Sequence, residues 1–382
     1  MDPLSPDRER RLVALVKAAD DAEQARRREA RHKVRSRRDG AAVPLDELDK
    51  RLLNLMQGKF PLEPRPYARV AELADVSEDE VLRRVRRLVD DRIIRQVTPI
   101  FDTRVLGYSS MLVAAKVDAE NPHRAAKVVN AHPGVSHNYL RNHDFNLWFT
   151  IATEPGSKLG VEGTLEVLQR EMGAESIRQL PTLKLFKINM NLEMAGGTKD
   201  LAAAGVAEEP LEPEAIELSD ADIALIRTLQ GDMPVVAEPY APAAEELGIT
   251  VETLLGQLES LRERRGLRRV AAILYHRRAG FSANGMGVWN VPEERIMELA
   301  PQMAAYRGIS HCYQRPTYED WPYSVFTMAH GRSKEECDAI LDSIAADTGI
   351  DDWRTLYSST EFKKIRLLYF TDDHKRWERE HT

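Results

Sequence analysis

The sequence predicts an α+β protein of two tandem repeats, each a winged helix-turn-helix followed by a βαββαβ domain. Residues 45–109 align without a gap on residues 218–282, at a constant offset of 173. After one inserted residue, residues 134–141 (GVSHNYLR) align with residues 308–315 (GISHCYQR). A repeat this long indicates duplicated domains, because solenoid repeats are only about 20–50 residues long. Within each repeat, helical spacing of apolar residues gives way to strand-like alternation.

The composition indicates a folded protein and excludes several functional classes. Of 382 residues, 43% are hydrophobic and 30% are charged, which suffices for a core. Mean hydropathy is −0.44, and no apolar run approaches the ~18 residues that a membrane span needs. The N-terminal residues also lack the apolar centre of a signal peptide. We therefore expect a cytoplasmic protein. Cys312 and Cys337 are the only cysteines, which excludes a disulfide framework and iron–sulfur or Cys-rich zinc sites. The net charge of −7 disfavours a protein that mainly binds nucleic acid.

Each repeat opens with the pattern of three short helices. In the first repeat, leucines between residues 45 and 55 follow a helical spacing, and a Pro-rich break leads to a helix near residues 68–74. Ser77 caps a third helix, with Glu80 in the capping-box position, and Thr250 caps its counterpart. The predicted buried positions of the third helices are Val81, Val85, Leu88, Leu254, Leu258 and Leu261.

Extended segments follow in each repeat. Residues 93–101 predict a hairpin or wing. The strands expected next in the first repeat are 111–117, 135–143, 146–152 and 182–192, with helices at 122–131 and 158–172. This order fits a ferredoxin-like βαββαβ sandwich, an antiparallel sheet with both helices on one face. The other face must therefore be covered by a partner or a ligand.

These patterns divide the chain into seven segments. They are a charged N-terminal tail (1–44), helix-turn-helix 1 (45–106), ferredoxin-like domain 1 (107–194), a linker (195–217), helix-turn-helix 2 (218–279), ferredoxin-like domain 2 (280–371) and a C-terminal tail (372–382). The N-terminal tail is rich in arginine and carries a net positive charge. A solvated or partly helical tail is the simpler interpretation, and a nucleic-acid contact is the alternative.

The second strand of each βαββαβ domain carries a row of polar side chains. Successive side chains point to opposite faces, so His137, Tyr139, Arg141 and His143 share one face. In the second repeat the matching face holds His311, Tyr313 and Arg315. These groups are costly to bury without partners. Because Asn138 and Asn142 make the opposite face polar as well, a solvated edge strand is the alternative interpretation.

The neighbouring strands indicate which face is free. Leu147, Phe149 and Ile151 suit the helix-covered face, which leaves Trp148 on the free face. The same alternation places Phe326, Met328 and His330 on the free face of the second repeat. The free face thus combines hydrogen-bond donors, a positively charged side chain and flat aromatic rings. Such a surface suits an anionic, aromatic ligand.

Other basic and aromatic residues are candidates for binding. The final strands carry Lys184 and Lys187 in one repeat and Lys363, Lys364 and Arg366 in the other. Salt bridges on a solvated rim are one interpretation of these cations, and clamps for several carboxylates are the other. His276 reads as part of a surface turn, with an axial metal ligand as the alternative, and Trp321 and Tyr323 read as packing residues when taken alone.

Several common enzyme classes have no motif in this chain. The nucleotide-binding patterns GxGxxG and GxxxxGK[ST] are absent. The hydrolase and metalloprotease patterns GxSxG and HExxH are absent too, and the histidines lack the paired spacing of a protein-built zinc site. A hydrolase with paired carboxylates stays open, although nothing in the sequence singles out such a pair.

The motifs resemble one known family. Residues 45–53 (LDELDKRLL), the helix-turn-helix and the βαββαβ domain resemble the Lrp/AsnC regulator architecture. Within it, residues 139–148 (YLRNHDFNLW) and residues 311–316 (HCYQRP), with 321–323 (WPY) and 328–331 (MAHG), are similar to sirohaem decarboxylases. The resemblance covers about residues 45–195 and 218–371. The first half looks like the smaller subunit type and the second like its partner, fused in one chain.

The resemblance implies removal of the carboxyl groups of two acetate side chains of sirohaem, giving 12,18-didecarboxysirohaem on routes to haem d1 or to haem by the alternative pathway. It implies no redox cofactor or added metal, because the iron arrives with the substrate. It also implies a pseudo-dimer of the two halves, and the sequence leaves a homodimer of the whole chain open. Arg141 and Arg315 would hold carboxylates, and Tyr139 and Tyr313 would donate hydrogen bonds. The expected proton donors are His137, His143 and His311.

A wider set of residues is expected to bind the tetrapyrrole. Its members are aromatic or basic side chains on the free faces, the final strands and the loops beside them. They are Trp148, Lys184, Lys187, His276, Trp321, Tyr323, His330, Lys363, Lys364 and Arg366.

A transcriptional regulator is the main alternative. The third helix of each half would then read DNA with its N-terminal residues, which here are Glu78, Asp79 and Glu80, and Glu252 in the second half. Carboxylates at these positions would repel phosphates, whereas arginines further along the first of these helices keep the alternative open. A haem-binding sensor or chaperone without turnover is a third hypothesis.

Overall fold

The computed structural model describes residues 44–58, 60–188, 213–275 and 283–382. Glu47–Thr382 form one compact unit, which contains all helices and strands of the described residues. Among these residues, every helix is too short or too polar to cross a lipid bilayer. His276 and the linker expected at 195–217, apart from its last residues, lie outside the described residues, as does nearly all of the N-terminal tail.

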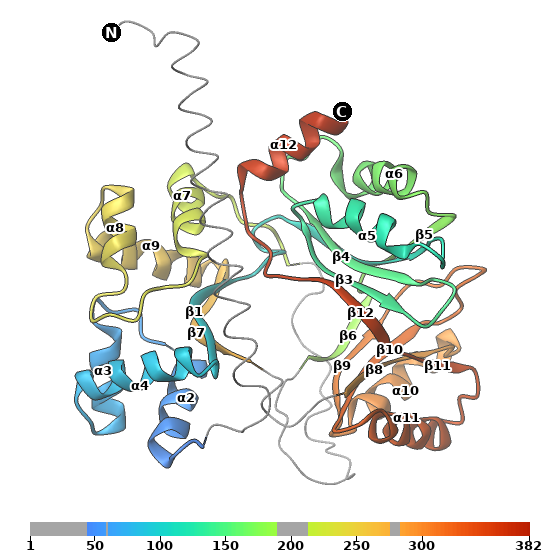
Figure 1. The fold of residues 1–382 in the computed structure, drawn as a ribbon, viewed down its shortest axis with the longest axis horizontal. Helices are drawn as coiled ribbons and strands as arrows, with labels where there is room; N and C mark the ends of the chain where they lie inside the picture. The colour runs from blue at the N-terminus through green and yellow to red at the C-terminus, as the bar shows by residue number, and fades with distance from the viewer. Residues whose placement is uncertain (1–43, 59, 189–212, 276–282) are drawn as a thin grey trace, which may run out of the picture. The chain divides into compact units, whose positions relative to one another are not determined.

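Three helices open each repeat, as predicted. They are α2 (Glu47–Gly58), α3 (Pro66–Ala74) and α4 (Glu78–Asp90) in the first repeat, and α7 (Asp220–Leu229), α8 (Ala241–Leu247) and α9 (Val251–Glu263) in the second (Figure 1). The Ser77 side chain accepts a hydrogen bond from the Glu80 amide, and Thr250 caps α9 in the same way. The reciprocal capping-box bond expected of Glu80 is replaced by ion pairs to Arg83 and Arg84. A complete capping box is present instead at Ser219 in the second repeat.

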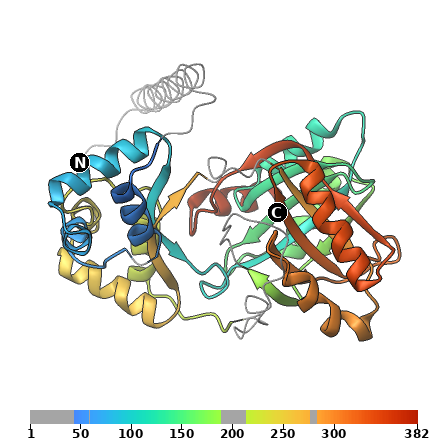
Figure 2. The same cartoon turned by 90° about the horizontal axis from the view of Figure 1, so that it is seen from below.

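The two wing strands pair with each other. β1 (Ile94–Phe101) and β7 (Leu267–Leu274) form a two-stranded antiparallel sheet, with Val97 opposite Ala272, and both views show them side by side (Figures 1 and 2). Of the two predictions for residues 93–101, the wing is therefore confirmed and the hairpin is wrong. The segment contains no Asn-Gly or other tight-turn pair, so it stays extended and takes its partner from the other repeat.

The sheets exchange their last strands. The first repeat contributes β2 (Ser109–Lys116), β3 (Val135–Arg141), β4 (Leu147–Thr153), β5 (Ser176–Leu180) and β6 (Lys184–Ile188). The second contributes β8 (Ala283–Trp289), β9 (Ile309–Gln314), β10 (Val325–Gly331), β11 (Trp353–Leu356) and β12 (Ser358–Lys364). The sheet orders are β12-β3-β4-β2-β5 and β11-β8-β10-β9-β6. Each half therefore lends one strand to the sheet of the other half.

This exchange departs from the predicted sandwich, in which residues 182–192 complete the sheet of their own half. In the structure β5 takes that edge position beside β2. Pro181 follows directly and has no amide hydrogen to continue the ladder. The chain then crosses to the other sheet, where β6 pairs with β9.

One face of each sheet is covered by helices, as predicted. α5 (Pro122–Ala131) and α6 (Gly160–Met172) pack on the first sheet, and α10 (Glu293–Ala304) and α11 (Lys334–Thr348) on the second (Figure 1). The other faces, here called the inner faces, meet in a shared apolar cluster. It joins Trp148 and Leu180 of the first sheet to Val288, Phe326 and Leu356 of the second. Each half therefore covers the free face of the other.

The residues after β12 contact the helix-turn-helix domains and link them to the two five-stranded sheets. Arg366 donates to the Thr98 hydroxyl (2.5 Å) and to the Gln230 carbonyl (3.2 Å). The segment predicted as a C-terminal tail forms α12 (Asp372–His381), and Trp377 on this helix packs into the core of the first βαββαβ domain. A buried tryptophan explains why these polar residues form an ordered helix.

Candidate active site

Two matching triads lie on the inner faces. The first-half triad is His137, Tyr139 and Arg141 on β3, and the second-half triad is His311, Tyr313 and Arg315 on β9. In both, the imidazole stacks on the tyrosine ring, at centroid distances of 6.1 and 5.9 Å and interplanar angles of 30° and 29°. The two halves therefore present the same groups in nearly the same geometry.

The strand that carries the first-half triad lies inside its sheet. β3 pairs with β12 on one side and with β4 on the other, so the alternative of a solvated edge strand is wrong. Asn138 points to the helix-covered face, where its amide donates to the Asn130 side chain (3.0 Å) and lies 3.4 Å from the Ala126 carbonyl. The polar residue on the outer side is thus a satisfied core residue, and the polar row on the inner side needs its own explanation.

The two arginines of the triads reach across to the opposite half. Arg141 Nη1 donates to the carbonyl of Leu356 on β11 (2.9 Å), and Arg315 Nη1 donates to the carbonyl of Leu180 on β5. Burial lowers the pKa of each guanidinium to about 10. The Nε of each is buried without a hydrogen-bond partner among the described residues. A bidentate contact to a carboxylate would therefore use Nε and Nη2, because Nη1 is engaged.

Aromatic rings flank the same guanidiniums. Arg141 lies 5.8 Å from the ring centroid of Tyr139 and 5.7 Å from that of Trp148. Arg315 lies 5.0 Å from Tyr313 and 5.4 Å from the Phe326 ring. Burial raises the pKa of Tyr313 to about 12. Both phenols are therefore placed beside a cation that stays charged, which suits them to donate hydrogen bonds to an anion.

A serine precedes each triad histidine and binds its ring. In the first half, the Ser136 hydroxyl is hydrogen-bonded to His137 Nδ1 (2.9 Å) and to the Thr150 hydroxyl (2.8 Å). Burial, and then the charges of Lys364 and Arg95, lower the pKa of His137, whereas Glu361 opposes them. Because Nδ1 is engaged, Nε2 is the ring atom that can meet a ligand.

The second-half serine contacts two imidazoles. The Ser310 hydroxyl lies 2.6 Å from His311 Nδ1 and 2.6 Å from His330 Nε2. Burial, and then the charge of His330, lower the pKa of His311 to about 4. Sequence reasoning missed both serines. The shared Ser-His pair at residues 136–137 and 310–311 was the signal that could have identified them.

His143 lies apart from the triads. It follows β3, its Nδ1 accepts a hydrogen bond from the Phe145 amide (3.0 Å), and its ring packs 5.1 Å from that of Trp321. Trp321 is fully buried in the cluster between the sheets, together with Trp148 and Tyr323. These aromatic residues hold the inner faces together, and His143 borders them.

The predicted basic residues divide into two groups. Lys187 donates to the carbonyls of Ala304 (2.8 Å) and Tyr306 (3.1 Å) at the end of α10. Lys363 donates to the carbonyls of Asn130 (2.8 Å) and His132 (3.2 Å) at the end of α5. Both ammonium groups therefore cap helices on the outer faces instead of forming rim salt bridges. Burial lowers the pKa of Lys363 to about 8.

The remaining cations have different surroundings. The guanidinium of Arg366 is bound to the wing sheet and the loop after α7, as described above. Lys184 Nζ lies 3.1 Å from Met297 Sδ. Lys364 lies directly opposite His137 on β12, so it is the predicted lysine that the structure places beside a triad.

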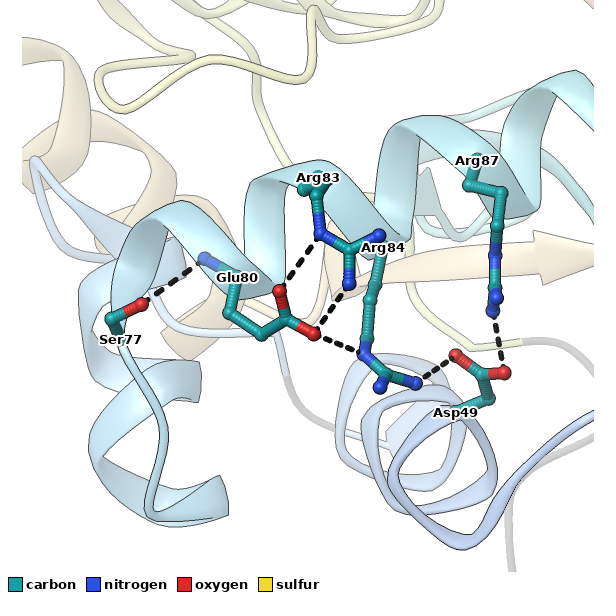
Figure 3. Close-up of polar contacts among 6 residues, drawn as sticks. All are labelled: Asp49, Ser77, Glu80, Arg83, Arg84 and Arg87. Atoms are coloured by element: carbon teal, nitrogen blue, oxygen red, sulfur yellow. Dashed lines mark hydrogen bonds and ion pairs between the residues drawn. The ribbon is translucent and has the colours of Figure 1, made fainter.

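The arginines of α4, the helix that would read DNA in a regulator, form contacts within the protein. Arg84 and Arg87 bind Asp49 on α2 (2.9 and 2.5 Å), and this carboxylate is only 1% exposed (Figure 3). Arg83 pairs with Glu80 (2.6 Å) and Arg86 donates to the Val235 carbonyl (3.0 Å). These contacts tie α4 to its neighbours and leave carboxylates at its N-terminus.

Comparison with family models supports the duplicated architecture. The AsnC-like ligand binding domain matches residues 105–187 and 278–363. The siroheme decarboxylase NirDL-like HTH domain matches residues 49–95 and 222–268. Both families occur twice, once in each repeat.

The similarity extends over nearly the whole length of several relatives. The "Siroheme decarboxylase" of Hydrogenobacter thermophilus is 37% identical over 88% of this chain and 98% of the relative. The "Siroheme decarboxylase NirDL subunit" of Paracoccus denitrificans is 32% identical over 84% and 97%. The crystal structure of the siroheme decarboxylase NirDL matches with a TM-score of 0.72 and 34% identity over 88% and 98%. A second structure of that protein, in co-complex with an iron-uroporphyrin III analogue, matches with a TM-score of 0.72 and 33% identity over 87% and 98%.

Proposed function

The chain belongs to the sirohaem decarboxylase family, and we propose that it removes the carboxyl groups of two acetate side chains of sirohaem as CO2, giving 12,18-didecarboxysirohaem. The observation that carries this proposal is the match to a sirohaem decarboxylase at 37% identity over 98% of that relative. The related protein crystallised with an iron-uroporphyrin III analogue supports a tetrapyrrole as the ligand class. The product would supply a route to haem d1 or to haem by the alternative pathway.

The reaction class is that of a carboxy-lyase. Loss of CO2 from a ring acetate leaves an electron pair on the methylene carbon, which the conjugated macrocycle can delocalise. One proton then completes the methyl group. Atoms and electrons balance without an oxidant, so the proposal includes no redox cofactor, and the iron is part of the substrate. The protein has to bind the remaining carboxylates and supply one proton for each CO2 released.

The inner-face triads are suited to both tasks. Arg141 and Arg315 stay charged although they are buried, and each has an unpartnered Nε. They would bind carboxylates that are not reacting, because a firm grip on the reacting carboxylate would stabilise the ground state and slow its loss. His137 and His311 each present Nε2 as the atom that can exchange a proton. Tyr139 and Tyr313 would donate hydrogen bonds beside them.

A DNA-binding regulator is not favoured. The arginines of α4 are paired within the protein, and its first turn carries Glu78, Asp79 and Glu80. Phosphates would meet these carboxylates first, and few base edges offer them a donor. The family comparison agrees, since the helix-turn-helix model that matches both repeats is the one of sirohaem decarboxylases.

The experiment is a direct test of turnover. Purified protein is incubated anaerobically with sirohaem, and the tetrapyrrole is analysed by mass spectrometry while released CO2 is trapped. We expect a mass loss equal to two molecules of CO2 per sirohaem and a matching yield of CO2. Sirohaem that binds and keeps its mass over hours would contradict an enzyme and favour a haem sensor or chaperone.

A further inference from the structure

The two repeats differ at one position beside the triad histidine. The amide of Ala152 donates to the Gly134 carbonyl (3.0 Å), and the amide of His330 donates to the Gly308 carbonyl (2.9 Å). Gly134 and Gly308 begin the aligned segments of the two repeats, so Ala152 and His330 occupy equivalent positions. The second half therefore has an imidazole where the first half has a methyl group.

This extra imidazole is joined to His311 through one hydroxyl. Ser310 is buried, at 2% exposure, and its Oγ lies 2.6 Å from both His311 Nδ1 and His330 Nε2. Its next contact, the Met328 carbonyl, is longer at 3.5 Å. A hydroxyl has one proton and two lone pairs, so it can donate to one ring while it accepts from the other. Three groups thus form a continuous hydrogen-bonded chain.

The equivalent chain in the first half ends on a hydroxyl. Ser136 joins His137 to Thr150, and an alcohol does not hold an extra proton near neutral pH. The first-half imidazole also faces the positive charges of Lys364 and Arg95, which oppose its protonation. The first half is therefore better equipped to bind a carboxylate than to deliver a proton.

We propose that His330 and Ser310 form a relay that delivers a proton through His311 to the substrate carbon from which CO2 has left. The proposal rests on the proposed function, and it assigns proton delivery to the second half. His311 contacts the reacting carbon in this scheme, whereas Ser310 and His330 act through it as positioning and relay residues.

The step balances as three short proton transfers. The electron pair on the methylene carbon takes the proton from Nε2 of neutral His311. At the same time the Ser310 hydroxyl proton moves to Nδ1 of His311, and the proton on Nε2 of the His330 imidazolium moves to the Ser310 oxygen. His311 ends neutral with its proton on Nδ1, Ser310 is again a hydroxyl, and His330 ends neutral. Before the second carboxyl loss, solvent protonates His330 on Nε2, and the His311 ring gives up its Nδ1 proton and takes a new one on Nε2.

The surroundings of His311 explain why a relay is needed. Burial and the charge of His330 hold the pKa of His311 near 4, so this ring is neutral at neutral pH. Across the sheet it faces Met328 on β10 and Ile188 on β6, and Tyr313 stacks on it. A neutral imidazole is a weak acid by itself. Coupling to a second imidazole allows it to donate without being left as an imidazolate anion, because Nδ1 takes up a proton as Nε2 loses one.

The test compares single substitutions at Ser310. Ser310→Ala removes the bridging hydroxyl, and Ser310→Thr keeps it. We expect Ser310→Ala to lower kcat about 100-fold with less than about a twofold change in KM, and Ser310→Thr to restore most of the rate. Ser343→Ala, at an exposed helix serine that donates to the Ala339 carbonyl of its own helix, is the matched control and should keep the full rate.

A second variant separates a relay from local packing. His330→Ala should lower kcat as much as Ser310→Ala, and the double variant should be no slower than either, because the residues act as one chain. Additive losses, a full rate for Ser310→Ala, or a failure of Ser310→Thr to restore the rate would overturn the relay. So would an equal loss of kcat in Ser136→Ala, since the first half would then deliver protons as well.

An independent readout needs no turnover. In the ligand-free full-length chain labelled with ¹⁵N-histidine, NMR should show His311 with its proton on Nε2 and Nδ1 as acceptor. Ser310→Ala should shift the ring signals of both His311 and His330. If the wild-type protein leaves sirohaem unchanged, the proposed function fails. These spectra still show whether the hydrogen-bonded chain from His330 through Ser310 to His311 exists. A proton on Nδ1 of His311, or unshifted signals in Ser310→Ala, would contradict it.

Discussion

The two repeats hold the same triad in different surroundings. In the first half, His137 lies opposite Thr150 on β4 and opposite Lys364 on β12. A hydroxyl and an ammonium group therefore flank this imidazole across the sheet. These neighbours suit the binding of a carboxylate, because both can donate to it.

In the second half, the cross-strand neighbours of the triad imidazole are apolar. His311 lies opposite Met328 on β10 and opposite Ile188 on β6. A low-polarity environment disfavours the charged ring, which agrees with the lower pKa of His311. The two repeats thus share the triad, and the strands on either side give each triad a different electrostatic environment. A single chain can divide binding and proton delivery in this way.

What the halves share is as informative as what separates them. Arg141 and Arg315 each bind a main-chain carbonyl of the opposite half, and Lys187 and Lys363 each cap a helix of the opposite half from an exchanged strand. Each site therefore depends on both halves for its shape. We therefore expect the two triads to perform different steps, although each depends on the other half for its shape.

The largest expected effect comes from the triad histidines. His311→Ala should lower kcat about 1000-fold, because it removes the group that donates the proton. His137→Ala should lower kcat less than about tenfold and mainly raise KM. Steady-state CO2 release with sirohaem measures both. Equal losses of kcat in the two variants would contradict the division of roles.

A smaller effect is expected on binding through Lys364. Lys364→Met removes an ammonium group beside His137, and we expect KM to rise about tenfold, or about 1.4 kcal/mol. The effect should shrink at high salt, because this lysine is exposed and screened. Ile188→Met, the equivalent position opposite His311, is the matched control. A KM that rises as much in the control would show that the strand, and not the charge, is responsible.

A third effect concerns stability in acid and not turnover. Because the pKa of His311 lies near 4 when folded and near 6.5 when unfolded, the unfolded chain binds a proton first as pH falls. The folded state therefore loses stability between about pH 6.5 and 4, by about 3 kcal/mol for this residue. Urea unfolding at about pH 7 and about pH 5 should show a shallower loss for His311→Gln than for the wild type. An unchanged loss would mean that His311 is solvated in the folded protein.

The sequence was sufficient for the features with strong periodicity. The constant offset between the repeats, the Ser77 and Thr250 caps and the parity of the β3 side chains as far as Arg141 all predicted local structure correctly. Parity also placed His143 on that face, which was wrong, because β3 ends at Arg141 and the His143 ring packs against Trp321. Parity also predicted that the free faces need a cover, because alternation alone separates Leu147 and Phe149 from Trp148.

Long-range pairing was the part that local patterns could not predict. A strand's own sequence does not say which sheet it joins, so the exchange of β6 and β12 and the pairing of β1 with β7 were missed. For the same reason Lys187 and Lys363 were taken for ligand clamps. Their carbonyl partners belong to the other half, and they become neighbours only after the strands cross over.

The most direct measurement is a turnover of sirohaem in D2O under anaerobic conditions, followed by mass spectrometry of the tetrapyrrole. The account predicts a product that has lost two CO2 and carries one deuteron on each new methyl group, because exchangeable protein groups supply the proton. A tetrapyrrole that returns with all its carboxyl groups, or methyl groups without deuterium, would contradict it.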